Sequence, residues 1–335
     1  MQHLLPLTAV GALAPVLGLR LAPVLRGPIR YLCPSCGGSL LPSGTMLRCA
    51  SGHAIDCAKE GHHYLLKRPP PPAVVKESDE IARAGRAFHD AGGYAKQADA
   101  VAAEVVRALG PRPADGAGAP RQLLAAGCAD GFYLRAVERA LQARSKKGGD
   151  GNVGDGSAPA SVGLWGIDSG KLAVRYAAKR QPSARFAVAP GHALPFADGV
   201  FDLVFSAFAP SSWDEYCRVL RPGGAVVVAR AGPRHLKELR ALSGAPTFSE
   251  PKQFAAGQGE LYCRFASEER YRGEVLLHLL ETTPFCRRAS PERQAAMRRY
   301  AEDEEGLLLT VDIISTTHRV WLGTGGFAEK PDNLY

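Results

Sequence analysis

The chain lacks several features that would place it in a special class of protein. After position 30, no run approaches the ~20 unbroken apolar residues of a membrane-spanning helix, which argues against a polytopic membrane protein. Eight cysteines in 335 residues are too few for a disulfide scaffold. With 46% apolar and 22% charged residues, the main body is not disordered, collagenous or a coiled coil. The length suggests about two domains.

Acidic residues are missing from the start of the chain. None occurs before Asp56, whereas residues 1–30 hold Arg20, Arg26 and Arg30. Prolines interrupt any continuous helix in this leader. An acid-free, Arg-bearing leader is typical of an organelle transit peptide, so we expect an organelle, the chloroplast before the mitochondrion, and otherwise the cytoplasm. A mis-assigned start codon and a signal or anchor segment are the alternatives.

Four of the eight cysteines lie close together near the N-terminus. Cys33 and Cys36 form a C-x2-C turn, and Cys49 is followed by His53 after three residues. Two such turns present four ligands at the corners of a tetrahedron, which predicts a structural zinc site with no position left for water. Free thiols or a redox pair are the alternative. Three other residues are alternatives to His53 as the fourth ligand: Cys57, His62 and His63. We otherwise expect Cys57 to be a small buried side chain.

Two segments look like seams between folded parts. Pro69 to Pro72 form a run of four prolines, which predicts a stiff, non-helical spacer. Residues 144–161 contain no aromatic residue and a single valine, so they have too little apolar surface to offset their ordering entropy. We therefore expect a disordered insertion there, between a helix and a strand.

The rest of the chain alternates between two hydrophobic periods. We expect strands at Gln122–Ala126, Val162–Asp168, Arg185–Val188, Phe201–Ala207 and Ala225–Arg230, and helices at Glu77–Asp90, Lys96–Leu109, Phe132–Ala143, Lys171–Arg180 and Trp213–Leu220. A Pro222-Gly223-Gly224 turn precedes the last of these strands. Such alternation predicts a Rossmann-like α/β fold with a mostly parallel sheet covered on both faces. Its ligand site lies at the carboxyl ends of the strands.

Three loops fall at that predicted edge. Residues 125–131 form a small-residue turn, where backbone can approach a ligand closely. Asp168 ends the next strand, and its carboxylate can accept hydrogen bonds from a ribose diol. Residues 193–198 precede the buried strand at 201–207. The combination indicates a nucleoside-containing ligand.

Several longer motifs carry a resemblance to a known family. They are the cysteine and histidine cluster, Asp56-Cys57-Ala58-Lys59-Glu60-Gly61, Arg86 to Tyr94 (RAFHDAGGY), Ala207-Phe208-Ala209-Pro210, Gly232-Pro233-Arg234-His235-Leu236 and Thr283-Pro284-Phe285. From about Tyr31 to about Trp321 the chain resembles the bacterial 23S rRNA guanine-N1 methyltransferases. The resemblance implies an N-terminal zinc ribbon followed by a class I methyltransferase domain. That domain is expected to contain a seven-stranded sheet and to use S-adenosylmethionine.

The resemblance also implies a domain division and a set of partners. The expected parts are a leader (1–30), a zinc ribbon (31–68), a proline linker with a helical segment (69–110), a methyltransferase domain (111–323) and a tail (324–335). The expected partner is large-subunit rRNA, with which a net charge of +8 is compatible. A homodimer is a further option, and no membrane is expected.

The resemblance also implies roles for individual residues. Those expected to border S-adenosylmethionine are Tyr94, Asp130, Gly131 and His235, with Gly127 in the same small-residue turn. Asp168 matches the acid expected on the ribose, and Asp198 matches the loop acid that approaches the adenine amino group. A general base is not identified; the candidates are Asp202, Asp214 and His235.

The chain departs from the family pattern in the first loop. Ala125 replaces an acid and Ala129 replaces a glycine. If position 129 needs a positive φ, alanine is unfavourable by on the order of 1 kcal/mol. We therefore expect this chain to be an rRNA guanine-N1 methyltransferase that binds S-adenosylmethionine more weakly than its relatives do. The alternatives are a methyltransferase for a small molecule or protein, and a non-catalytic RNA-binding or ribosome assembly factor.

Overall fold

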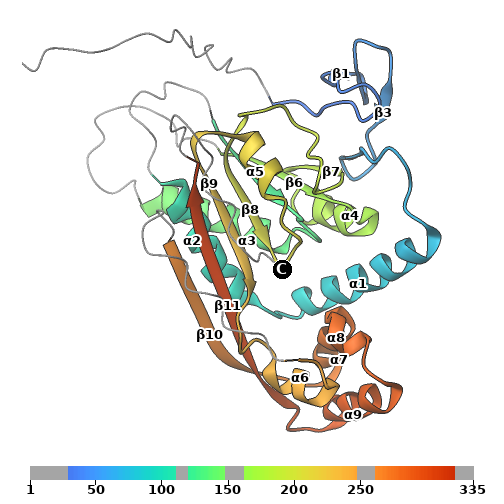
Figure 1. The fold of residues 1–335 in the computed structure, drawn as a ribbon, viewed down its shortest axis with the longest axis vertical. Helices are drawn as coiled ribbons and strands as arrows, with labels where there is room; N and C mark the ends of the chain where they lie inside the picture. Colours follow the sequence, from blue (N-terminus) through green and yellow to red (C-terminus); the bar gives the residue numbers. More distant parts are fainter. Residues whose placement is uncertain (1–28, 111–119, 148–161, 247–260, 321–335) are drawn as a thin grey trace, which may run out of the picture.

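The computed structural model describes residues 29–110, 120–147, 162–246 and 261–320 (Figure 1). The expected leader up to residue 28, the part of the expected insertion from 148 to 161 and the expected tail at 324–335 lie outside these ranges. The described residues form a small three-stranded sheet and an eight-stranded sheet with helices on both sides. Among them, no helix combines the length and the apolar character needed to cross a membrane.

The N-terminal part of the chain contains the three-stranded sheet of the ribbon and the first four strands of the large sheet. Its elements are β1 (Leu41–Ser43), β2 (Met46–Arg48), β3 (Ala54–Asp56), β4 (His62–Tyr64), α1 (Pro72–Asp90), α2 (Ala95–Leu109), β5 (Arg121–Ala126), α3 (Phe132–Lys147), β6 (Val162–Asp168), α4 (Lys171–Arg180) and β7 (Arg185–Val188).

The second half completes the sheet and adds a group of helices. Its elements are β8 (Phe201–Ala207), α5 (Trp213–Val219), β9 (Leu220–Ala231), α6 (Lys237–Ser243), β10 (Leu261–Tyr271), α7 (Gly273–Thr282), α8 (Pro284–Arg287), α9 (Pro291–Glu302) and β11 (Leu307–Arg319).

The large sheet has the order β10-β11-β9-β8-β5-β6-β7-β4. The pairs from β4 to β9 are parallel, whereas β11 runs antiparallel to both β9 and β10. The chain order progresses outward in one direction through β5, β6 and β7, and in the other through β8 and β9. A topological switch point therefore lies between β5 and β8. The expected mostly parallel sheet is confirmed.

The sheet has one strand more than the seven expected. The eighth, β4, comes from the segment expected to belong to the ribbon, and His62 to Tyr64 pair in parallel with Phe186 to Val188 of β7. The strand was not expected because its three residues give too short a hydrophobic pattern to identify. The ribbon segment is thus joined to the α/β domain by main-chain hydrogen bonds.

Alternate residues of the central strands enter two separate cores, as the period of a strand requires. Leu123 and Ala125 of β5 contact the core formed with α2, α3 and α4. Leu124 and Ala126 contact a second core, which contains the ribbon residue Leu40 and residues of α5. Because both faces are covered, the parallel strands are almost continuously apolar.

Several element boundaries differ from the expected ones. The helix α1 begins at Pro72, so the proline run is not wholly non-helical; proline suits the first helical position because no N–H is needed there. The helix α3 continues to Lys147, and the Arg144 guanidinium donates to the Val106 carbonyl at 3.2 Å. Residues 144–147 of the expected insertion are therefore helical.

The expected turn before β9 lies inside the strand. Phe201 pairs with Leu220 and Leu203 with Ala225, so the β9 residues between Leu220 and Ala225 form an irregularity opposite β8. Such a bulge adds residues to one strand without ending the pairing. The strand therefore begins at Leu220, five residues earlier than expected.

The hairpin of β10 and β11 extends beyond the carboxyl ends of the parallel strands. Pairing between β9 and β11 ends at Ala231 and Ile313, whereas pairing between β10 and β11 continues to Tyr271 and Leu307. The hairpin carries α7, α8 and α9 there, and α7 contacts α1 (Figure 1). Helices thus flank the edge of the sheet where ligands bind in this architecture.

Candidate cofactor site and metal centre

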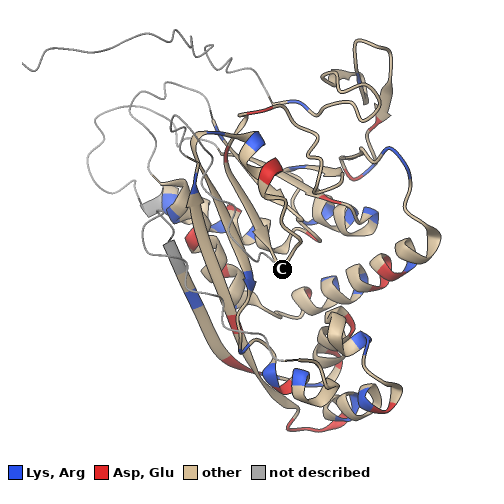
Figure 2. Ribbon diagram, viewed as in Figure 1, with Lys and Arg blue, Asp and Glu red and all other residues tan. Residues whose placement is uncertain are grey.

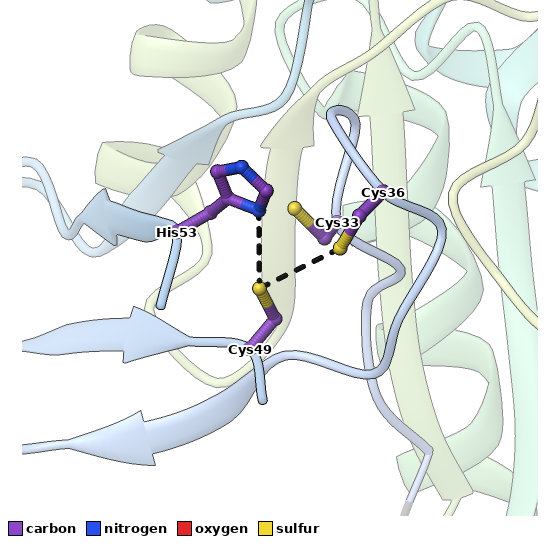
Figure 3. A group of neighbouring side chains, drawn as sticks. All are labelled: Cys33, Cys36, Cys49 and His53. Atoms are coloured by element: carbon purple, nitrogen blue, oxygen red, sulfur yellow. Dashed lines mark hydrogen bonds between the residues drawn. The ribbon is translucent and has the colours of Figure 1, made fainter. Parts of the chain in front are cut away.

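The four predicted metal ligands come together in the ribbon (Figure 3). The ligand atoms of Cys33, Cys36, Cys49 and His53 all lie within 4.8 Å of one another. Cys33 and Cys36 belong to a turn closed by the Gly37 N–H on the Cys33 carbonyl at 2.8 Å. The other two ligands flank the turn between β2 and β3.

The donor set fits a tetrahedral zinc ion. The Cys36 and Cys49 Sγ atoms are 3.6 Å apart, and Cys49 Sγ is 3.4 Å from His53 Nδ1. Ligands at about 2.3 Å from a tetrahedral zinc lie roughly 3.8 Å from one another. The Gly38 backbone amide and the Ser51 side chain lower the pKa of the Cys36 thiol to about 6, which favours the thiolate. With four protein donors, the site has no open position for catalysis.

The alternative ligands lie outside this cluster. His62 is buried in β4, and the His63 Nδ1 atom is 3.3 Å from the Asp56 carbonyl. Cys57 is exposed, so the expectation of a buried side chain is wrong. Cys57 forms an isolated β-bridge with His63 at the edge of the ribbon, where too few neighbouring residues are present to bury its thiol.

At the carboxyl edge of the large sheet, Asp168 connects two loops. Its Oδ2 accepts the Ala129 N–H at 3.0 Å, and its Oδ1 accepts the Gly170 N–H at 2.8 Å. Burial raises the pKa of this carboxyl above its ordinary value. Each carboxylate oxygen retains a lone pair beyond these bonds, so the fixed side chain can still accept a hydrogen bond from a ligand hydroxyl.

The first loop has the backbone conformation that makes its alanine unfavourable. Ala129 has a φ of 45°, in the left-handed region that favours glycine. Gly127, with a φ of 77°, lies so close to the loop after β8 that an added Cβ would be 2.3 Å from Ala209 Cβ. The small residue is thus required by contact between two loops of the protein.

Asp130 is used to hold the same loop in place. Its side chain is 4% exposed, and Oδ2 accepts a bond from the Arg180 guanidinium at 2.7 Å. Oδ1 lies 3.2 Å from His89 Nδ1 and accepts the Phe132 N–H at the start of α3. The hydrogen bonds outweigh desolvation and lower the pKa of the carboxyl. Next to it, Gly131 lets α3 approach Ala177 of α4.

Tyr94 and His235 are far apart in sequence but in contact at this edge. The His235 Nδ1 accepts the Asp312 N–H at 3.3 Å, so in the neutral ring Nε2 carries the proton. Nε2 lies 3.3 Å from the Tyr94 hydroxyl and donates to it. Burial lowers the pKa of His235 to about 4, which keeps the ring neutral. The Tyr94 hydroxyl retains its own proton to donate.

The structure does not bring Asp198 to this edge. Asp198 precedes the amino end of β8, and its carboxylate accepts a bond from Arg218, at the end of α5, at 2.8 Å. The expected cofactor site lies at the carboxyl ends of the strands, whereas Asp198 lies near the amino end of β8, at the other edge of the sheet. The structure gives no support to the expected contact with adenine, because the Asp198 carboxylate is paired with Arg218 near the amino end of β8.

The general-base candidates are also separated. Asp202 lies near the amino end of β8 and accepts bonds from the Arg221 guanidinium and the Gln122 N–H. His235 has its Nδ1 occupied and its Nε2 protonated, so neither nitrogen is available. Asp214, exposed in the first turn of α5, is the candidate that follows the carboxyl end of β8.

Sequence reasoning missed a group of aromatic residues at this edge. Phe208 follows β8, and its ring centroid is 6.3 Å from Tyr94, 5.9 Å from Tyr133 and 5.8 Å from His235. The position of Phe208 directly after a buried strand was a usable signal. The grouping itself was not visible, because these residues lie on four separate loops and helices.

Comparisons with known proteins match both parts of the chain. The family model described as "RlmA, N-terminal", a zinc ribbon, matches residues 31–74, and a "Methyltransferase domain" model matches residues 149–228. The 23S rRNA (guanine(748)-N(1))-methyltransferase of Streptomyces fradiae is 34% identical over 213 residues, which cover 63% of this chain and 67% of that protein.

Two further matches are a second relative of the same identity and a solved structure of low identity. A Micromonospora griseorubida protein named "Putative 23S rRNA (guanine-N(1)-)-methyltransferase" is 34% identical over 218 residues, which cover 62% of this chain and 67% of that protein. The YcgJ protein of Bacillus subtilis has a crystal structure that matches with a TM-score of 0.39 and 15% identity, covering 67% of this chain and 98% of that one. The similarity to the Streptomyces fradiae protein extends over two thirds of the length of that protein. This chain therefore belongs to the family of 23S rRNA (guanine-N1)-methyltransferases.

Proposed function

We propose that the protein transfers a methyl group from S-adenosylmethionine to N1 of a guanine in large-subunit rRNA. The observation that carries the proposal is the 34% identity to a methyltransferase named for this reaction, over two thirds of that protein. A class I strand order and a ribbon whose four donors fit zinc support it. We propose that the zinc is structural and that the ribbon contributes to RNA recognition.

The chemistry needs little more than positioning. S-adenosylmethionine supplies the methyl group on its sulfonium. Transfer to guanine would replace the N1 proton by the methyl group and would give N1-methylguanine, S-adenosylhomocysteine and a proton. In the protein, Asp168 and residues 127–131 would hold the nucleoside, and Tyr94, fixed by His235, offers a hydrogen-bond donor beside it. Such positioning supplies much of the rate in reactions of this kind.

Basic side chains near both parts of the chain are suited to phosphate contact. Lys59, Lys67 and Arg68 are exposed on the ribbon and on the segment that leads to α1. Figure 2 shows further basic residues on α9, where Arg298 and Arg299 are exposed, interspersed with acids. Phosphate contacts of this type give affinity that falls with salt and carry no sequence information.

The test combines cofactor binding with product mapping. We expect S-adenosylmethionine to bind the zinc-loaded chain in calorimetry, and we expect Asp168→Ala to abolish that binding. Asp198→Ala is the matched control, because this acid lies at the opposite edge of the sheet. On an unmodified large-subunit rRNA transcript, the wild-type protein should create a primer-extension stop at one guanine, since an N1 methyl group blocks base pairing. Cofactor binding with no stop on this rRNA would contradict the proposal.

A second candidate function is a non-catalytic RNA-binding factor. The observation in its favour is the left-handed φ of Ala129, whose N–H already occupies one oxygen of Asp168. Binding of the rRNA transcript by a folded, zinc-loaded chain that does not bind S-adenosylmethionine would support this candidate over the enzyme.

We also propose an organelle location and leave a homodimer as an option. The acid-free, Arg-bearing composition of residues 1–30 supports import, with a chloroplast placed before a mitochondrion. A fluorescent protein carrying these thirty residues should enter the organelle, and cytoplasmic fluorescence would contradict the proposal. Sedimentation equilibrium of the whole chain would determine whether it dimerises.

A further inference from the structure

Phe208 combines exposure with an unfavourable backbone conformation. Its side chain is 40% exposed, although it lies directly after the buried strand β8. Its φ is 54°, and its N–H is held by the Ala229 carbonyl at 2.9 Å. A bulky side chain at positive φ destabilises the backbone, and an exposed ring contributes little to the core. Folding alone does not explain why phenylalanine stands here.

The strain at Phe208 belongs to a pattern. Among the described residues, those other than glycine with positive φ are Tyr94, Ala129, Phe208 and Leu236, with φ values of 59°, 45°, 54° and 52°. They come from four separate connections: the turn between α1 and α2, the loop after β5, the loop after β8 and the loop before α6. Ala129, Phe208 and Leu236 follow carboxyl ends of strands, and Tyr94 contacts the same site through His235. Backbone strain concentrated in this way is typical of functional sites.

The surroundings of Phe208 are aromatic and contain an unused polar group. The ring of Tyr94 is nearly parallel to that of Phe208, at 20°, and the Tyr133 ring lies 5.9 Å away. The Tyr133 hydroxyl is shielded from solvent and has no hydrogen-bond partner among the residues described. An unpaired buried hydroxyl is unfavourable unless a ligand satisfies it. The exposed Phe208 ring therefore lies beside a tyrosine whose hydroxyl has no partner among the described residues.

We propose that the target guanine, once out of its RNA stack, stacks on Phe208 and presents its edge to the Tyr133 hydroxyl. This rests on the proposed function, because it concerns the substrate of the same site. A base within folded RNA must be unstacked before its N1 can be reached, and a protein ring replaces the lost stacking. Guanine carries donors and an acceptor along the edge that contains N1, so it can pair with a hydroxyl in either direction.

The first test replaces the ring at position 208. Phe208→Leu keeps an apolar side chain but removes the stacking face, and Phe208→Trp restores one. For Phe208→Leu we expect kcat/KM on the unmodified rRNA transcript to fall about 10- to 100-fold, the range of one base–aromatic stacking interaction. Phe208→Trp should recover activity to within about threefold of the wild type. Calorimetric binding of S-adenosylmethionine should not change, which separates the base from the cofactor.

The matched control is Val74→Ala, an exposed apolar residue (53% exposed) in the first turn of α1. It should leave kcat/KM unchanged. An active wild type with Phe208→Leu within threefold of it would overturn the stacking proposal and leave the proposed function intact. A wild type that binds S-adenosylmethionine but methylates no rRNA would remove the proposed function, and this inference with it.

The second test removes the unpaired hydroxyl. Tyr133→Phe takes away a polar group without a protein partner, so a purely structural role predicts an equal or higher free energy of unfolding and unchanged activity. We expect stability to be retained and kcat/KM on the transcript to fall about tenfold, with cofactor binding unchanged. Unchanged kcat/KM would show that this hydroxyl does not meet the base, and weaker cofactor binding would show that it faces the cofactor instead.

Discussion

The metal centre and the carboxyl-edge site are built in opposite ways. The four metal ligands lie between Cys33 and His53 in the chain, on two turns of one small ribbon. The edge site joins Tyr94, Asp168 and Phe208 with His235 and its partner Asp312, which are spread over most of the chain. The ribbon thus depends on local spacing, whereas the edge site depends on the strand order of the sheet.

This difference also affects what stabilises each region. The ribbon strands have three residues each and no buried side chain of their own. Their support comes from the ligand cluster and from neighbours such as Tyr31, whose ring contacts Trp165 at 5.3 Å. Buried ion pairs hold the edge site in place, and a large apolar core supports its strained loops. Removing the metal should therefore affect mainly the ribbon, and removing a buried charge mainly the edge.

The largest effect is expected from loss of the metal. Cys49→Ser should abolish zinc binding and the order of the ribbon, because structural zinc supplies much of the folding free energy of small domains. Metal analysis and limited proteolysis of residues 31–60 measure both. Cys57→Ser is the control, since its thiol is exposed and outside the cluster. Equal zinc loss in the two variants would show that the cluster is wrongly assigned.

The next effect concerns the ion pair that supports the edge site. Asp312 is fully buried and accepts two bonds at 2.7 Å from Arg264, and Asp312→Asn removes the carboxylate charge from this pair. We expect the free energy of unfolding in urea to fall by about 3 kcal/mol. Asp99→Asn, which breaks the exposed pair with Arg139, should lower it by less than about 1 kcal/mol. Similar losses in both variants would contradict this ranking.

The pH dependence of stability should reveal the titration of two of the buried histidines, His235 and His318. Burial lowers the pKa of both His235 and His318 to about 4, against 6.5 for the ordinary side chain. Between these values the unfolded chain binds more protons than the folded one, so stability falls as pH decreases from about 6.5 to about 4. Each histidine should contribute on the order of 1 to 3 kcal/mol across that window.

His318→Phe tests this at a distance from the edge site. Its ring contacts Trp213, so phenylalanine retains the packing. Urea unfolding at pH 7 and pH 5 should show a smaller decrease in stability for the variant than for the wild type. An unchanged decrease would mean that His318 does not titrate as its burial requires.

The smallest effect is expected in the strained first loop. Ala129→Gly relieves the positive φ, so we expect stability to rise by about 1 kcal/mol and S-adenosylmethionine to bind more tightly. Ala91→Gly is the control: Ala91 has a φ of −79°, and glycine there should destabilise by up to about 1 kcal/mol. A loss of stability in Ala129→Gly would contradict this account. Ala125→Asp is a poorer test, because Ala125 is buried in the core.

Prediction from sequence succeeded where the pattern was local. The bounds of β6, β7, β8 and α4 agree with the expected ranges, because each is a short periodic segment between clear turn signals. The four metal ligands follow from two turns and their spacing. The departure at Ala129 was also visible, since a glycine position in a tight turn implies a positive φ.

Prediction failed where a residue's role depends on distant parts of the chain. Asp198 had the right chemistry but lies at the wrong edge, and β4 joined the large sheet although its three residues gave no strand pattern. The expected position of Asp130 beside the cofactor stays a prediction, but no local pattern indicated that its carboxylate pairs with Arg180, fifty residues away. A sequence shows which polar side chains are present, but it does not show which buried residue each of them bonds to in the folded chain.

The sequence by itself determined the α/β class, the ligand set of the ribbon and the strained first loop, because period, spacing and residue size act within a few turns of chain. Only the tertiary structure decided which side chains share the carboxyl edge. There the strand order brings Tyr94 to His235, and Phe208 to Tyr133, across the switch point. Main-chain pairing between strands distant in sequence sets those positions, and no local pattern encodes it.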